Sequence, residues 1–204
     1  MTEEEARVWL RGRFGVPRET LLARYVELVV EHSRLQNLIA PSTVADIWTR
    51  HVVDSAQLVA LDGSGEGQWI DIGSGAGFPG VVTAILTNRP TTLIEPRRKR
   101  AEFLTIVADT LGCRHLEVAQ AKVEQVKGPR AATISARAVA AASALLSAAV
   151  HLSDADTLWL LPKGKSAQAE VDEARKAWHG AFHVEQSITQ SDSAIIVATG
   201  VSVR

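Results

Sequence analysis

A run of four closely spaced glycines, directly after a hydrophobic segment, constrains the fold more than any other feature of this 204-residue chain. Residues 69–80 read WIDIGSGAGFPG, and a helical pattern follows them. Glycines at this spacing let the backbone turn tightly and approach a ligand closely, while the first turn of the following helix offers free N–H groups. The segment therefore predicts a strand, a loop and a helix, with a nucleotide-like cofactor bound at the loop.

Two acidic residues bear on which nucleotide this loop binds. The stretch 75–80 matches the dinucleotide fingerprint G-x-G-x-x-G, which leaves a nicotinamide dinucleotide open. Asp71, however, ends the strand two residues before Gly73, and a carboxylate there suits a cationic amino-acid group, as in S-adenosylmethionine, better than a pyrophosphate. The next predicted strand ends at Glu95, where an acidic side chain can accept both ribose hydroxyls of either cofactor. S-adenosylmethionine is the favoured cofactor.

From Gln68 onward, short apolar runs alternate with helical patterns, which is typical of repeated strand–helix units around a parallel sheet. The last two predicted strands follow one another without a helical pattern between them, so the sheet should carry an antiparallel edge. The predicted fold class is α/β, with a seven-stranded, mostly parallel, Rossmann-like sheet. We expect strands at 68–72, 91–95, 115–119, 131–135, 156–161, 181–187 and 194–199, and helices near 78–88, 97–111, 139–151 and 166–178.

Residues 1–61 have a different pattern, because their apolar residues recur at helical spacing. The segment 62–67 (DGSGEG) has no apolar anchor and is the best candidate for a boundary. The chain length and a hydrophobic fraction of 46% fit one globular unit with an extension. We therefore expect a helical N-terminal cap (1–61) and a cofactor-binding domain (68–204) integrated into one unit.

The balance of charges excludes a strong general attraction to nucleic acid or to an anionic membrane. The chain has 22 Lys and Arg against 23 Asp and Glu, for a formal net charge of -1. A polyanionic partner would need a local basic patch, and the run 97–100 (RRKR) is a candidate. This run opens a predicted helix, where the helix dipole disfavours cations. Either an external anion or a solvated basic helix face would account for it.

Other features point to the cytoplasm as the compartment. The single cysteine, Cys113, cannot form an internal disulfide, and the N-terminus is too acidic and polar for a secretory signal. The most apolar stretch, 138–150, is shorter than the roughly 20 residues that a membrane-spanning helix needs. We expect no membrane segment, no metal site, and a monomer.

Further segments follow the glycine loop in a family-specific order. They are Asn37-Leu38, RHxxDS at 50–55, RRKRxxFL at 97–104, SARA at 135–138 and LPKG at 161–164. With DIGSGAGFPG at 71–80, this set resembles the ribosomal RNA small subunit methyltransferase G family, also called glucose-inhibited division protein B. The similarity spans roughly residues 30–165. It implies a class I methyltransferase fold and transfer of a methyl group from S-adenosylmethionine to nitrogen 7 of a guanine in 16S rRNA of the small ribosomal subunit.

The resemblance also implies roles for individual residues on the cofactor side. Gly73 and Phe78 would line the methionine and adenosine side of the loop, and Val123 and Glu124 would flank the adenine. Arg137 matches the family arginine beside the cofactor and the target base. The full set expected to bind the cofactor is Asp71, Gly73, Gly75, Gly77, Phe78, Glu95, Val123, Glu124 and Arg137.

On the substrate side, nitrogen 7 of guanine carries a lone pair and no proton, so its methylation requires alignment but no general base. Arg137 and Lys163 are the expected catalytic residues, because their side chains could hold the target through its phosphate or its O6 edge. The expected substrate-binding residues are Arg50, His51, Arg97, Arg98 and Lys163. For His51 and Asp54, three residues apart on one helix face, a structural hydrogen bond from the N-terminal cap to the core is the competing interpretation.

Two other functions remain open from the sequence. One is a small-molecule methyltransferase on the same fold, which would not depend on the basic residues. The other is a non-enzymatic RNA-binding or ribosome assembly factor with a vestigial cofactor loop, although Asp71 and the intact glycines oppose it.

Overall fold

The computed structural model describes residues 1–63 and 65–204, so Ser64, within the expected boundary segment 62–67, lies outside the described residues. A seven-stranded sheet in the order β3-β2-β1-β4-β5-β7-β6 forms its centre. Strands β1 to β5 run parallel, and β7 is antiparallel to both β5 and β6, as predicted. The strands are β1 (Trp69–Ile72), β2 (Thr91–Ile94), β3 (Leu116–Ala119), β4 (Thr133–Ala136), β5 (Leu158–Lys163), β6 (Trp178–Gln186) and β7 (Ala194–Val203).

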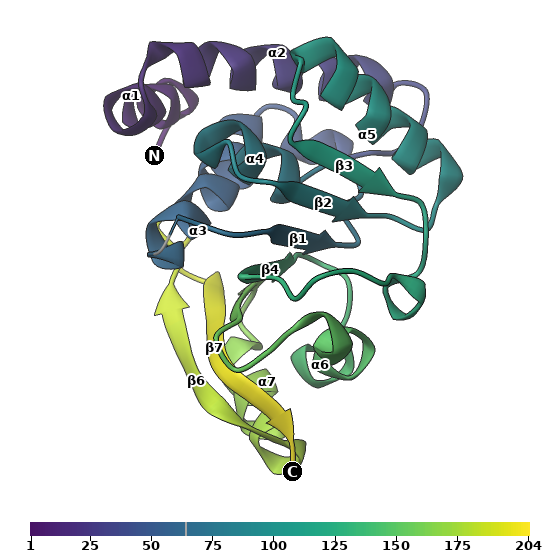
Figure 1. The fold of residues 1–204 in the computed structure, drawn as a ribbon. Coiled ribbons are helices and arrows are strands. Elements are labelled where there is room, and N and C mark those ends of the chain that lie inside the picture. Colours follow the sequence, from purple (N-terminus) through teal and green to yellow (C-terminus); the bar gives the residue numbers. More distant parts are fainter. Residues whose placement is uncertain (64) are drawn as a thin grey trace.

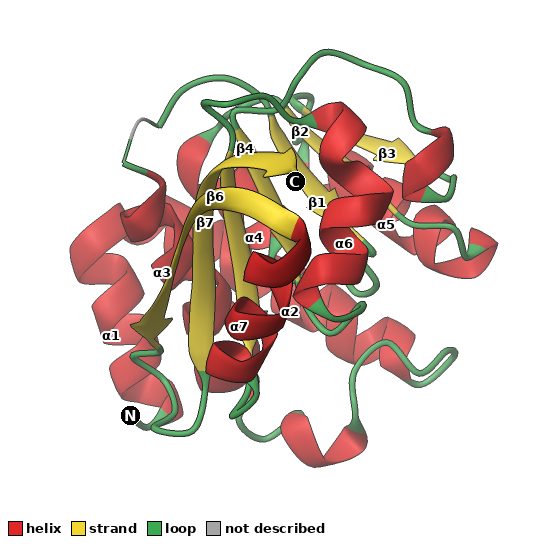
Figure 2. Cartoon of the chain, turned by 90° about the horizontal axis from the view of Figure 1, so that it is seen from below, coloured by secondary structure: helices red, strands yellow, loops and turns green. Residues whose placement is uncertain are grey.

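Helices cover both faces of the sheet (Figure 1). One core contains residues of α1, α2, α4 and α5, and the second contains residues of α6 and α7. Figure 2 shows α6 and α7 in front of the strands when the molecule is seen from below. The helices are α1 (Glu3–Phe14), α2 (Val16–Ser33), α3 (Asp54–Asp62), α4 (Gly80–Thr87), α5 (Arg98–Leu111), α6 (Ala142–Ala149) and α7 (Ala167–Ala177); a π-helical segment Trp48–Val53 precedes α3, and 3-10 turns lie at Pro41–Thr43, Val123–Gln125 and Val150–Leu152.

Strand β1 illustrates why the sequence folds this way. All four of its residues are buried, as expected for a central parallel strand covered on both faces. Successive side chains alternate between the faces, so Ile70 and Ile72 join the core beneath α6 and α7, while Trp69 packs in a smaller cluster with Leu58 of α3. Because β1 is buried on both faces, its position is fixed, and it places the glycine loop at the edge of the sheet.

The N-terminal helices pack on the same core as the cofactor-binding part of the chain. Leu22 and Val29 of α2 share one cluster with Val81 of α4 and Leu104 of α5. The Tyr25 hydroxyl donates a hydrogen bond to the Ala76 carbonyl oxygen (2.7 Å), which ties α2 to the glycine loop. The division into 1–61 and 68–204 remains a prediction.

The structure differs from the expected boundaries at the entrance to α6. A helix was expected from residue 139, but α6 begins at Ala142 because residues 137–141 form an irregular loop, with Ala138 at φ 54°. Lys163 Nζ donates a hydrogen bond to the Ala140 carbonyl oxygen (2.5 Å), and the Ala142 N–H donates to Glu170 Oε2 (2.8 Å). These side chains come from β5 and α7, so the local sequence could not reveal the loop.

Two smaller differences concern α4 and β6. Helix α4 begins at Gly80, two residues later than expected, because Pro79 serves as its N-cap. Strand β6 begins at Trp178, directly after α7 and three residues before the expected start. Its pairing with β7 is irregular between His179 and Ala181, where Gly180 adopts φ 145°. None of these differences changes the topology.

Candidate cofactor and substrate site

An open cavity of about 760 Å³ lies where the glycine loop, the π-helical segment and the loops after β4 and β5 meet. This is the carboxyl edge of the parallel strands, where ligands bind in open α/β sheets. Of the residues predicted from the sequence, the cavity walls include Arg50, His51, Gly73, Gly75, Phe78, Arg137 and Lys163. The walls also include residues that were not predicted as site residues, among them Thr43, Asp54, Arg100, Glu170, Gln190 and Ser193.

The glycine loop adopts the conformation that its sequence predicts. Gly73 and Gly75 have φ values of 67° and 57°, in the left-handed region that favours glycine. Gly77 has a different role, because it does not line the cavity and a Cβ at its position would lie 2.5 Å from Val81 Cγ2 and 2.7 Å from the Tyr25 hydroxyl oxygen. Gly73 and Gly75 therefore present backbone to the cavity, whereas Gly77 permits close packing beneath the loop.

Asp71 lies behind the loop rather than on the cavity wall. Its side chain is fully buried, and Oδ1 accepts a hydrogen bond from the Ser135 hydroxyl (2.7 Å). Oδ2 has no hydrogen-bond partner, and no ion pair involves Asp71 among the residues that the structure describes. Burial raises the pKa of Asp71 to about 6, although the Ser135 hydrogen bond opposes this shift. A buried, incompletely compensated carboxylate beneath the glycine loop favours a cationic ligand above it, which fits S-adenosylmethionine.

Glu95 is held by the backbone of the site. Its side chain is buried, and its two carboxylate oxygens accept hydrogen bonds from the N–H groups of Gly75 (2.9 Å) and Arg97 (2.8 Å). The carboxylate thus joins the glycine loop to the start of α5. A carboxylate oxygen accepts more than one hydrogen bond, so these contacts leave Glu95 able to accept from ribose hydroxyls as well.

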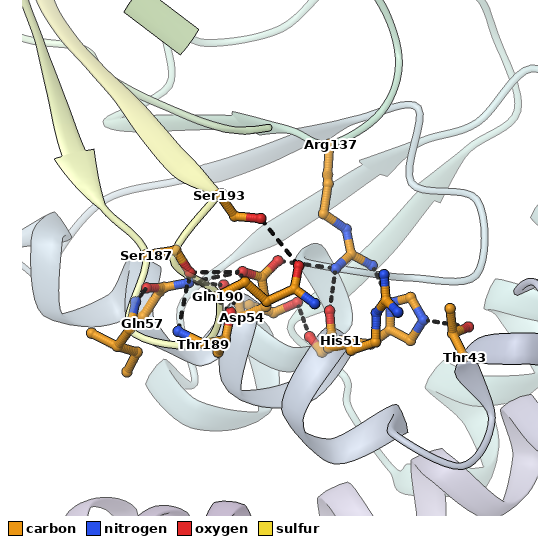
Figure 3. A network of polar contacts seen from close by, with 12 residues as sticks. Thr43, His51, Asp54, Gln57, Arg137, Ser187, Thr189, Gln190 and Ser193 are labelled. Carbon is orange, nitrogen blue, oxygen red and sulfur yellow. Dashed lines mark hydrogen bonds and ion pairs between the residues drawn. The ribbon is translucent and has the colours of Figure 1, made fainter. Parts of the chain in front are cut away.

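Arg137 is the centre of a polar network (Figure 3), several of whose residues line the cavity. Its Nη1 donates to Asp54 Oδ2 (3.2 Å) and to the Arg50 carbonyl oxygen (3.3 Å), and its Nη2 donates to His51 Nδ1 (3.0 Å). The guanidinium also lies 5.3 Å from the centre of the Phe78 ring, a cation–π arrangement. The predicted residues Arg50, His51, Phe78 and Arg137 therefore form one cluster.

His51 is held in its neutral form. Burial, together with the nearby positive charges of Arg137 and Arg50, lowers the pKa of His51 to about 3. Because Nδ1 accepts from Arg137, the ring proton lies on Nε2, which is 3.0 Å from Thr43 Oγ1. The ring stacks on Phe78 with 5.0 Å between the centroids. Both nitrogen atoms are therefore engaged, and the contact with Arg137 is a hydrogen bond of the kind that the competing interpretation of His51 expects.

Lys163 lines the cavity but is also engaged by neighbouring groups. Its side chain is 9% exposed and forms an ion pair with Glu170 (2.8 Å) in addition to its hydrogen bond with the Ala140 carbonyl oxygen. These contacts fix the loop 137–141 beside Gly73, against which Val139 packs closely. The observed contacts of Lys163 therefore shape the cavity wall.

The other predicted residues surround the cavity without lining it. Arg97 and Arg98 are exposed at the start of α5, where Arg98 pairs with Glu102 (3.5 Å). Val123, which is half-buried, and the exposed Glu124 belong to a 3-10 turn after β3. Arg100, from the same basic run, does line the cavity and donates a hydrogen bond to the Asn37 carbonyl oxygen (3.4 Å).

The sequence patterns missed the cavity residues that depend on distant contacts. Asp54 belongs to the RHxxDS segment, so its position in a motif was the available signal. Gln190 and Ser193 lie in the turn between β6 and β7, for which no sequence pattern indicated a role. The structure brings this turn to the cavity because the antiparallel hairpin lies beside β5.

The overall fold is similar to that of solved structures. A S-adenosylmethionine-dependent methyltransferase from Aquifex aeolicus matches the fold with a TM-score of 0.60, at 13% identity, over 82% of this chain and 96% of that chain. Among the described residues, no helix is long and apolar enough to cross a membrane, and no group of three or more His, Cys, Asp or Glu is arranged to hold a metal ion. The fold is that of class I S-adenosylmethionine-dependent methyltransferases.

Sequence comparisons define the family. Residues 18–195 match the family model described as rRNA small subunit methyltransferase G. The chain is 47% identical to the ribosomal RNA small subunit methyltransferase G of Sphingopyxis alaskensis over 201 residues, which are 97% of this chain and 86% of that protein. It is also 47% identical to the protein of the same name from Rhizorhabdus wittichii, over 100% of this chain and 95% of that protein. The chain belongs to the rRNA small subunit methyltransferase G family, which confirms the resemblance found in the sequence.

Proposed function

We propose that this protein transfers the methyl group of S-adenosylmethionine to nitrogen 7 of one guanine in 16S rRNA of the small ribosomal subunit. The bound cofactor supplies an electrophilic methyl group on a sulfonium. The protein has to align the guanine, exclude competing water and tolerate the positive charge that the base acquires.

The observation that carries this proposal is a cavity with several cations and no free base. Arg50, Arg100, Arg137 and Lys163 reach its walls. The two carboxylates on the described part of its walls, Asp54 and Glu170, are both in ion pairs with these cations. His51 is neutral and both of its ring nitrogens are engaged. Such a site suits a nucleophile that has a lone pair and no proton to lose, as guanine nitrogen 7 has.

The cofactor residues follow from the same geometry. Gly73 and Gly75 would approach the methionine part of S-adenosylmethionine, and Asp71 would compensate its positive charge from behind the loop. Glu95 would accept hydrogen bonds from the ribose. Phe78, Gly77, Val123, Glu124 and Arg137 complete the proposed cofactor-binding set, with Gly77 acting through packing and the 3-10 turn 123–125 beside the adenine.

The substrate residues divide into two groups. Arg137 would hold the guanine or its phosphate inside the cavity, supported by His51 and Lys163. Arg50, Arg97 and Arg98, which are exposed, would contact the RNA backbone around the entrance. These exposed arginines supply the local basic patch that the net charge of -1 makes necessary. We further propose that the enzyme acts as a monomer in the cytoplasm.

Charge reversal on α5 tests the RNA substrate against a small-molecule substrate. The variant Arg97→Glu with Arg98→Glu should weaken binding to small ribosomal subunits about tenfold at moderate salt, because it removes contacts that release counterions from the RNA. It should also make the dependence of affinity on salt less steep. The affinity for S-adenosylmethionine should stay within twofold, since neither side chain lines the cavity.

A matched control is available at exposed cations outside the cavity. Arg114→Glu with Lys176→Glu changes the net charge equally, at the far end of α5 and on α7. The control should bind subunits almost as the native protein does. Equal losses in both double variants, or no loss in either, would argue for the small-molecule alternative.

A further inference from the structure

The Asp54 carboxylate connects two parts of the site that are far apart in the sequence (Figure 3). Oδ2 accepts from Arg137 (3.2 Å), at the end of β4. Oδ1 accepts from Gln57 Nε2 (2.9 Å), from the Thr189 hydroxyl (3.2 Å) and, at 3.4 Å, from the Ser187 hydroxyl. The side chains of Asp54 and Arg137 are only 14% and 18% exposed, so this network is largely shielded from water.

The turn that carries Thr189 is fixed to α3. The Ile188 N–H donates to Gln57 Oε1 (2.9 Å), and the hydroxyls of Ser187 and Thr189 lie 2.9 Å apart. The same turn places Gln190 on the cavity wall. The β6–β7 turn is therefore a second wall of the site, connected to the first through these hydrogen bonds.

Arg137 depends on these contacts for its orientation. A guanidinium has five N–H groups, of which three donate to Asp54, to His51 and to the Arg50 carbonyl oxygen. The two that remain, on Nε and on Nη2, have no acceptor among the residues that the structure describes. Because the guanidinium is planar and rigid, fixing three donors also fixes the direction of the other two.

We propose that Thr189 and Asp54 are positioning residues: the β6–β7 turn (residues 187–193) holds Asp54, and Asp54 directs the two remaining N–H groups of Arg137 toward the substrate. Charge-assisted hydrogen bonds supply both the energy and the geometry for this role. The orientation of Arg137 is a property of the protein, whereas its benefit for catalysis rests on the function proposed above.

Thr189→Val tests this role, because valine keeps the shape of threonine and removes only the hydroxyl. We expect kcat/KM for methylation of small ribosomal subunits to fall about tenfold. We also expect the NMR order parameter of the Arg137 Nε–H bond, measured with cofactor absent, to fall from a rigid value of about 0.85 toward 0.6. Thr189→Ser should keep both quantities close to their native values, since serine retains the hydroxyl. Thr199→Val on β7 is the matched control and should change neither, since the Thr199 side chain makes no hydrogen bond in the described part of the chain.

A double-mutant cycle separates positioning from general destabilisation. In the Arg137→Lys background, Thr189→Val should lower kcat/KM less than twofold, because its effect passes through the arginine. The proposal is overturned if Thr189→Val leaves either the native kcat/KM or the order parameter unchanged, or if its tenfold loss persists beside Arg137→Lys. If the native protein methylates no rRNA, the proposed function fails, while the order parameter still decides whether the turn orients Arg137.

Discussion

At the scale of single residues, the site combines a buried carboxylate with a half-buried neutral imidazole, and the two respond to pH in opposite ways. The folded protein binds a proton at Asp71 more tightly than the unfolded chain does, because burial raises the pKa of this group from 3.8 to about 6. It binds a proton at His51 less tightly, because burial and two arginines lower the pKa from 6.5 to about 3. Ionised Asp71 therefore costs stability at neutral pH, whereas the titration of His51 costs nothing there and destabilises the folded protein only below about pH 6.5.

Asp71→Asn should weaken the binding of the cofactor without lowering the stability of the protein. We expect the affinity of the native protein for S-adenosylmethionine to rise as the pH increases through about 6, because the ionised carboxylate attracts the cationic cofactor. The variant should bind about tenfold more weakly at pH 7.5 and should lose this pH dependence. Calorimetric titration between pH 5 and pH 8 measures both effects.

Thermal unfolding of the cofactor-free protein provides the control for this variant. At pH 7.5 Asp71→Asn should unfold at the same temperature as the native protein or at a higher one, because it removes a buried charge. A variant with normal affinity and a normal pH profile would show that Asp71 does not serve the cofactor.

His51→Asn should change stability in a pH-dependent way. Between pH 3 and pH 6.5 the unfolded chain protonates His51 while the folded protein does not, so this residue's contribution to the free energy of unfolding increases with pH. The native protein should therefore gain stability over the variant from pH 4 to pH 7, by at most about 1.4 kcal/mol per pH unit. Urea unfolding at several pH values measures the difference, and a difference that grows toward acid pH would contradict a neutral His51.

At the scale of elements, the first turn of α4 sets how closely the glycine loop approaches the sheet. A Cβ on Gly80 would overlap Leu93 Cδ2 of β2 and would lie 2.7 Å from Asp71 Cβ. Gly80→Ala should therefore lower the free energy of unfolding by about 1–3 kcal/mol or more, as overpacking does. Cofactor affinity should fall as well, since α4 begins directly after the loop.

Gly12→Ala is the matched control for this packing effect. Gly12 is exposed within α1, and a Cβ there meets no atom within 4 Å. Alanine at this position should stabilise the protein by roughly 0.5–1 kcal/mol through its helix propensity. Chemical unfolding of both variants tests the contrast, and equal effects would mean that close packing at Gly80 is unimportant.

The sequence predicted those elements that depend on local patterns. All seven strands and the antiparallel edge are present, because alternating apolar runs and the missing helix between the last two strands are local signals. Within the loop 137–141, residues 139–141 were predicted as helix, since their alanine-rich sequence favours one while the groups that oppose it, Lys163 and Glu170, lie on β5 and α7.

The same distinction holds for the site. The glycine loop and Glu95 were predictable, because both follow strand ends at a fixed spacing. The ion pair of Asp54 with Arg137 joins residues 83 positions apart, and the contact of Asp54 with Thr189 spans 135. Only the assembled sheet brings these side chains together, so the motif indicated their importance but not their partners.

At the scale of the whole molecule, the sheet brings together site residues that are far apart in the chain. The glycine loop, Arg137 and Lys163 come from the ends of parallel strands, His51 from the π-helical segment and Gln190 from the hairpin. Four basic side chains, Arg50, Arg100, Arg137 and Lys163, reach the cavity walls although the protein as a whole is nearly neutral. Local positive charge of this kind attracts a polyanion toward the cavity.

Transfer of labelled methyl from S-adenosylmethionine to small ribosomal subunits, prepared from cells that lack this protein, tests the central claim most directly. The account predicts label in 16S rRNA at nitrogen 7 of a single guanine, mapped by cleavage at the modified base. Label on a different atom, on several unrelated bases or on no RNA at all, from a protein that binds the cofactor, would contradict it.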